Sequence, residues 1–157
     1  MSTTRREVLK TGGGMTLLAL LGAAGWLKPE DAAAQAWNKS AFEAKTMDDT
    51  MKAFGGGAPA QSKDIAFVST PDIAENGAVV PVGVSSSIPK TESIAILIEK
   101  NPNMLVASFD IPPGTDPAIS TRVKMGQSSN VYALVKADGK YYVASKEIKV
   151  TLGGCGG

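Results

Sequence analysis

From residue 58 onward, the chain is a series of short apolar runs separated by proline, glycine, asparagine and serine. Runs of this length that are rich in valine and isoleucine predict β-strands, because β-branched side chains pack well on a pleated surface. The absence of helical stretches between them favours antiparallel pairing over a parallel α/β fold. We therefore predict a mainly β fold, an immunoglobulin-like antiparallel β-sandwich. The seven predicted strands are residues 65–68, 78–84, 93–98, 104–111, 118–125, 131–136 and 141–151.

The last two predicted strands are joined by a tight turn. Asp138 and Gly139 stand between them, and this pair favours the positive φ angles that a two-residue hairpin needs. Residues 131–136 alternate between two sets of apolar side chains, so we expect that strand to have two distinct faces. Two proline-bearing segments, STPDIAENG and DIPPGTDP, are predicted to be plain loops, because proline cannot donate to a central ladder.

One short helix is predicted on the N-terminal side of the strands. Met47, Met51 and Phe54 recur at helical spacing. Thr46 is suited to cap the N-terminus of this helix, and the glycines at 55–57 end it. The apolar stripe could bind a partner protein, but core packing is the commoner role of a stripe at this spacing.

The composition argues against several classes of protein. The 157 residues carry a net charge of +1, without a basic block that contains aromatic residues, which argues against a nucleic-acid partner. The sequence has no histidine, which is the commonest general base near neutral pH and the commonest metal ligand. We therefore predict no catalytic residues, no metal and no other cofactor in this chain.

The start of the chain has the order of a signal peptide. Arg5 and Arg6 precede an apolar stretch at residues 15–27, and an Ala-x-Ala site follows, so cleavage is predicted before Trp37. The stretch is too short to span a membrane comfortably, so no stable membrane anchor is expected. The arginine pair in TRREVLK resembles the twin-arginine export motif, which implies delivery of a folded protein to the periplasm. Loss of the leader removes four basic and three acidic residues, which leaves a formally neutral domain.

The only cysteine, Cys155, stands two residues before the end of the sequence. Gly153 and Gly154 precede it, and Gly156 and Gly157 follow it, so no neighbouring side chain crowds the thiol. The thiolate is the nucleophilic form, and the sequence offers no histidine or second cysteine to lower its pKa. We predict that these five residues form a flexible arm that presents the thiol to the active site of a partner, which then activates it.

Two other roles are considered for Cys155. An unpaired cysteine in an exported protein can form an intermolecular disulfide, so the chain could be a β-sandwich binding module that uses Cys155 for assembly. An autonomous redox enzyme is disfavoured, because the sequence has no C-x-x-C motif and no visible activating base.

The leader TRREVLK, the domain of short strands and the terminal GGCGG together resemble the SoxY family, the sulfur-carrier subunits of periplasmic thiosulfate oxidation by the Sox system. The resemblance implies that Cys155 is the covalent attachment point for sulfur intermediates such as an S-thiosulfonate, and that the flanking glycines form the swinging arm. It implies a non-catalytic carrier and a heterodimer with a SoxZ-like subunit. The other partners that it implies are a SoxAX-like cytochrome, a SoxB-like hydrolase that releases sulfate, and a sulfane dehydrogenase.

These features divide the chain into four segments. The segments are a twin-arginine signal peptide at 1–36, a helical segment at 37–57, a β-sandwich domain at 58–152 and the arm at 153–157. The sequence leaves two candidates open for the heterodimer interface, namely the methionine and phenylalanine stripe and exposed residues of the sheets.

Overall fold

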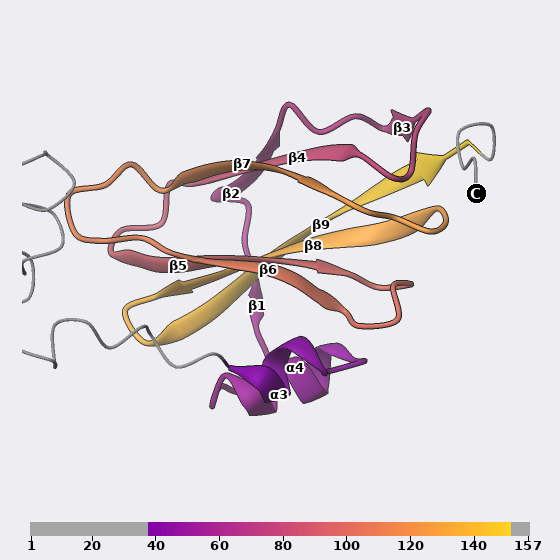
Figure 1. Cartoon of the computed structure of the whole chain (residues 1–157). Coiled ribbons are helices and arrows are strands. Elements are labelled where there is room, and N and C mark those ends of the chain that lie inside the picture. The colour runs from indigo at the N-terminus through magenta and orange to yellow at the C-terminus, as the bar shows by residue number, and fades with distance from the viewer. Residues whose placement is uncertain (1–37, 152–157) are drawn as a thin grey trace, which may run out of the picture. The chain divides into compact units, whose positions relative to one another are not determined.

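The computed structural model describes residues 38–151 of the chain. Two β-sheets lie face to face, and two short helices lie against the outer side of one of them (Figure 1). The helices are α3 (Lys39–Phe42) and α4 (Met47–Ala53). No helix within the described residues is long and apolar enough to cross a membrane.

The large sheet has the strand order β1-β9-β8-β5-β6, and β3 also pairs with β9; the small sheet has the order β2-β4-β7. The predicted β-sandwich is confirmed, and each of the seven predicted strands forms. The strand bounds are β1 (Ala60–Gln61), β2 (Ile65–Val68), β3 (Ile73–Ala74), β4 (Val80–Ser86), β5 (Thr91–Ile98), β6 (Leu105–Asp110), β7 (Ala118–Val123), β8 (Ser129–Ala137) and β9 (Lys140–Val150).

The main core lies between the two sheets. On β5, Ile94, Ile96 and Ile98 are fully buried and point into this core, where β-strand periodicity places every second side chain. The residues between them, Ala95 and Leu97, belong to a second apolar cluster on the opposite face of the large sheet. Residues 94–98 of β5 are therefore buried on both faces, and polar side chains could not occupy these five positions without partners.

The second cluster explains the helical segment. Thr46 caps the N-terminus of α4, because its hydroxyl accepts a hydrogen bond from the Asp49 amide at 3.1 Å. Met51 is 3% exposed and packs against the large sheet, with Met47 and Phe54 half-buried beside it. The stripe is core packing. The predicted short helix is confirmed as α4, and a four-residue helix that was not predicted, α3, precedes it. The extended backbone of Thr46 starts α4 anew after α3 has ended.

Two short strands depart from the predicted all-antiparallel pairing. Strands β1 and β3 have two residues each, and both pair in parallel with β9. Strand β3 lies inside the STPDIAENG segment, so the prediction of a plain loop is wrong at Ile73–Ala74. A two-residue strand is too short to show a period, and its pairing depends on the neighbour that the fold brings to it.

The predicted hairpin between β8 and β9 is confirmed. Asp138 has a φ of 49° and Gly139 a φ of 72°, as a two-residue turn with both central residues in the left-handed region requires. The two strands pair in register from Ala137–Lys140 at the turn to Ser129–Ile148. This long ladder sets the direction in which β9 leaves the sandwich.

The buried face of β5 can be tested by truncation. We expect Ile96→Ala to lower the free energy of unfolding by about 2–5 kcal/mol, because it opens a cavity in a fully buried site. Val79→Ala is the control, since Val79 is 50% exposed and its truncation should cost less than about 0.5 kcal/mol. Urea denaturation would measure both, and equal losses would contradict this placement of the core.

Candidate functional site

The residues predicted to carry the function lie outside the described part of the chain. They are Arg5, Arg6, Gly153, Gly154, Cys155, Gly156 and Gly157. What the structure does describe is the point from which the predicted arm departs. Strand β9 ends at Val150, and Thr151 is the last described residue, four positions before the cysteine. We call residues 148–151 and their immediate contacts the arm root.

The arm root is held on both sides. On one side the Ser128 hydroxyl accepts a hydrogen bond from the Val150 amide at 2.9 Å. On the other side β3 pairs with the last two residues of β9, and the Thr151 amide donates to the Ala74 carbonyl at 3.0 Å. Backbone pairing on two sides makes the end of a strand rigid, because each amide has a partner that would have to be given up. The arm therefore starts from a fixed position.

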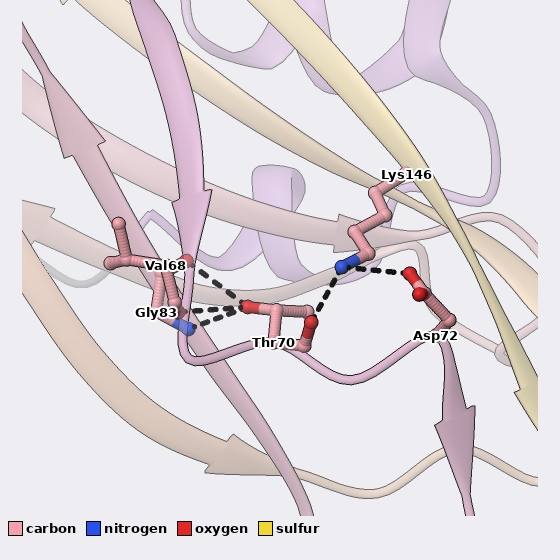
Figure 2. Close-up of polar contacts among 5 residues, drawn as sticks. All are labelled: Val68, Thr70, Asp72, Gly83 and Lys146. Atoms are coloured by element: carbon pink, nitrogen blue, oxygen red, sulfur yellow. Dashed lines mark hydrogen bonds and ion pairs between the residues drawn. The ribbon is translucent and has the colours of Figure 1, made fainter.

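Strand β3 reaches β9 through a short crossing, residues 69–72, which leaves the small sheet at the end of β2. Thr70 turns the chain here and is only 7% exposed. Its hydroxyl accepts a hydrogen bond from the Gly83 amide at 3.0 Å, and the same oxygen lies in donor range of the Val68 carbonyl at 3.1 Å and of the Gly83 carbonyl at 3.2 Å. Figure 2 shows this hydroxyl facing the backbone of Val68 and Gly83, which pair across β2 and β4.

Lys146 of β9 ties the same crossing to the large sheet. Its ammonium group donates to the Thr70 carbonyl at 2.5 Å and lies 3.0 Å from a carboxylate oxygen of Asp72 (Figure 2). The Lys146 side chain is 26% exposed, whereas that of Asp72 is 88% exposed. The bond to the half-buried carbonyl therefore contributes more than the solvated ion pair, which is worth at most about 1 kcal/mol. Thr70 and Lys146 together fix β3 beside the end of β9.

No sequence pattern indicated this pair of residues. Thr70 stands between Ser69 and Pro71 and looks like any loop residue, and Lys146 shares the inner side of β9 with Ala144 and Ile148 but stands between the polar Ser145 and Glu147. The positive φ of Ser69, at 52°, was not apparent either. A proline-flanked threonine and a lysine 76 residues away have no sequence relation that would reveal their contact.

Two of the ionisable groups with shifted pKa values, Glu92 and Lys136, lie at the hairpin end of the sandwich, whereas Tyr132, whose pKa is raised by burial, lies in the other half of β8. A hydrogen bond from Lys136, at 2.8 Å, is the largest cause that lowers the pKa of Glu92, and the Gly139 amide adds to it. The same carboxylate raises the pKa of Lys136. Because β9 begins at this end and the arm root is at its other end, this pair cannot act on the arm. No three His, Cys, Asp or Glu side chains within residues 38–151 are placed to hold a metal.

The Lys146 contact can be tested by substitution. Lys146→Met removes the donor to Thr70 and leaves a half-buried carbonyl without its partner, so we expect a loss of about 1–3 kcal/mol in unfolding free energy. The amides of Lys149 and Thr151, which donate to Asp72 and Ala74, should also exchange with deuterium faster.

Lys149→Met is the matched control, because Lys149 is an exposed lysine of the same strand and its side chain makes no ion pair among the described residues. Unchanged exchange at the arm root in the Lys146 variant would show that Lys146 does not position β3.

Comparisons with known proteins agree with this architecture. A family model described as sulfur oxidation protein SoxY matches residues 50–155. The solved structure of the sulfur carrier protein SoxY from Chlorobium limicola f thiosulfatophilum is 42% identical, covers 68% of this chain and 96% of its own, and has a TM-score of 0.61. A superoxide reductase (neelaredoxin) from Ignicoccus hospitalis is 21% identical over 55% of this chain and 79% of its own. Its TM-score of 0.48 is too low to support any argument.

No curated protein matches the chain. The family match spans more than half of the sequence, and the Chlorobium protein is similar in both sequence and fold. The described residues of this chain form two sheets, helices over one face and a last strand that ends at the terminal segment. The chain belongs to the SoxY family of sulfur oxidation proteins.

Proposed function

We propose that this protein carries sulfur intermediates covalently on Cys155 during the oxidation of thiosulfate to sulfate. The observation that supports the proposal most is that the SoxY match extends from α4 through the sandwich to Cys155 itself. The described arm root adds a physical reason, because a rigid strand end provides a fixed attachment point for a terminal segment that carries a thiol. The globular domain then anchors this segment, and partner enzymes carry out the chemistry.

The reaction cycle uses the thiol as its only attachment point. Loading joins the Cys155 sulfur to the outer sulfur of thiosulfate, which releases one proton and passes two electrons to an oxidant, a haem cytochrome of the SoxAX class. Hydrolysis of the resulting thiosulfonate consumes one water, releases sulfate and a proton, and leaves a persulfide. Oxidation of the outer sulfur by the sulfane dehydrogenase consumes three waters, releases seven protons, passes six electrons to that enzyme and yields a cysteine S-sulfonate. A second hydrolysis frees sulfate and restores the thiol.

The proposed setting is the periplasm, reached through the twin-arginine route by the leader that contains Arg5 and Arg6. The proposed partners are a SoxZ-like subunit in a heterodimer, the SoxAX-like cytochrome, a SoxB-like hydrolase and a sulfane dehydrogenase. Export of a folded chain would let the heterodimer form before translocation. The thiol needs activation by the partner that loads it, because its neighbours in the sequence are glycines, which supply no base.

The burial of the methionine stripe bears on the heterodimer interface. Met51 is 3% exposed within this chain alone, so it cannot also contact a second subunit. Of the candidates that the sequence left open, Met51 is therefore excluded, whereas the half-buried Met47 and Phe54 and the exposed residues of the sheets remain.

A binding module that uses Cys155 for an intermolecular disulfide is the second candidate function. The same terminal position that suits a carrier also suits a disulfide link in an oxidising compartment. Intact-mass measurement separates the two. A carrier shows adducts on Cys155 that depend on thiosulfate and disappear on reduction, whereas a linker shows a stable dimer mass without small adducts.

The carrier role predicts the effect of removing the thiol. We expect Cys155→Ser to reduce thiosulfate oxidation by the reconstituted partner proteins to background, because a hydroxyl cannot form the sulfur–sulfur bond. Ser145→Ala is the control, since Ser145 is an exposed residue of β9 and its loss leaves the thiol in place. Turnover by the Cys155→Ser variant at the control rate would rule out the carrier role.

A further inference from the structure

A groove with a volume of about 490 Å³ lies between the two open edges of the sandwich. One wall is β6, the last strand of the large sheet, and the other is β7, the last strand of the small sheet. The turn that contains Asn101 and Asn103 closes one end, and Leu105–Ala107 contribute half-buried and buried apolar side chains. A cavity of this size is within the range of small-ligand sites.

The charged side chains that line this groove are all positive. Arg122 and Lys124 line it, and its lining includes no aspartate or glutamate. Both cations are exposed, and neither takes part in the ion pairs found within residues 38–151. Asn103 adds amide donors to the lining, while the Asn101 amide is used to hold the Lys124 carbonyl at 2.9 Å. In a domain that is formally neutral as a whole, this arrangement favours an anion.

The groove and the arm root share one turn of the chain. Lys124 begins the turn between β7 and β8, and Ser128, which bonds Val150, ends it. Gly77 shows how close the two are, because a Cβ atom on it would lie 2.5 Å from the Met125 carbonyl oxygen and 2.8 Å from a methyl group of Val150. The residue that follows Lys124 is therefore next to the end of β9.

The length of chain beyond the arm root allows Cys155 to reach Lys124, because Met125, the residue that follows Lys124, lies beside the end of β9. Cys155 is four positions beyond Thr151, and an extended chain covers about 3.3 Å per residue, or about 13 Å. The cysteine side chain and a bound thiosulfonate add further length. Arg122, on β7, lies two residues before Lys124, or about 7 Å farther along the extended chain.

We propose that the groove between β6 and β7 receives the segment 152–157 when Cys155 bears a thiosulfonate, and that Arg122 and Lys124 bind the sulfonate oxygens. This inference rests on the proposed carrier function and extends it. The free thiol is neutral, whereas the loaded residue carries a sulfonate anion, so only the loaded arm gains the attraction. Guanidinium and ammonium donors bind tetrahedral oxyanions through charge-assisted hydrogen bonds. The glycines on either side of Cys155 allow the backbone to enter the groove.

The test loads the full-length chain without any partner enzyme. Tetrathionate converts the Cys155 thiolate into the thiosulfonate, because the cysteine sulfur bonds to an inner sulfur of tetrathionate and thiosulfate leaves. Iodoacetamide gives a neutral carboxamidomethyl adduct at the same atom. Nuclear magnetic resonance of the two adducts then compares the amides of Asn103, Arg122 and Lys124, and the order parameters of Gly154 and Gly156.

We expect the thiosulfonate, but not the neutral adduct, to shift the groove amides and to raise the order parameters of the two glycines from below about 0.6 towards the rigid value of about 0.85. The shifts should shrink when the ionic strength rises from about 0.1 M to about 1 M, because salt screens exposed charges. The loaded double variant Arg122→Gln/Lys124→Gln should lose both effects. Lys63→Gln/Lys140→Gln removes two exposed lysines outside the groove, changes the net charge equally and should retain them.

Groove amides that do not move, or that move equally with the neutral adduct or in the Arg122→Gln/Lys124→Gln variant, would overturn this inference. That outcome would leave the carrier function standing, because chemical loading involves no partner protein. Failure of the carrier function would be seen in a different experiment, as thiosulfate turnover by the Cys155→Ser variant. That result would not alter the spectra of the chemically loaded chain, so the two failures can be told apart.

Discussion

Burial of the two central strands of the large sheet on both faces is the constraint on which the rest of this structure depends. Strand β5 directs its isoleucines into the sandwich and Ala95 and Leu97 to the other face, and β8 does the same with Leu134 on the outer side. Apolar area of this kind is stabilising only when it is removed from water. The small sheet covers one face, and the helices α3 and α4 must cover the other.

The two edges of the sandwich differ in how far other parts of the chain cover them. On the β9 side, the crossing at residues 69–72 and the strands β1 and β3 cover the edge, with Thr70 and Lys146 holding the crossing in place. On the opposite side, β6 and β7 are edge strands, and each has one edge without a paired strand in the described part of the chain. Open edges are where proteins accept an added segment. The proposed docking of the loaded arm uses these open edges.

The sequence predicted most of the sandwich because its strands are long enough to show a period. Residues 65–68 match β2 in full, and the Asp138–Gly139 turn was predictable from its dipeptide alone. Thr46 was correctly identified as a helix cap. The errors fall where local pattern is absent. Strands β1 and β3 are two residues long, and the break between α3 and α4 depends on the extended backbone of one residue.

The candidate site divides in the same way. The sequence alone determined the chemistry that the chain can offer, since one cysteine between glycines and no histidine leave a single thiol without an internal activating base. Only the tertiary structure decided where the segment that carries the thiol leaves the sandwich and which residues hold that point. Thr70 and Lys146, or Met125 and Val150, are distant in sequence and become neighbours because the two sheets stack and β9 spans the length of the large one. Contacts of this kind follow from packing, which no short stretch of sequence records.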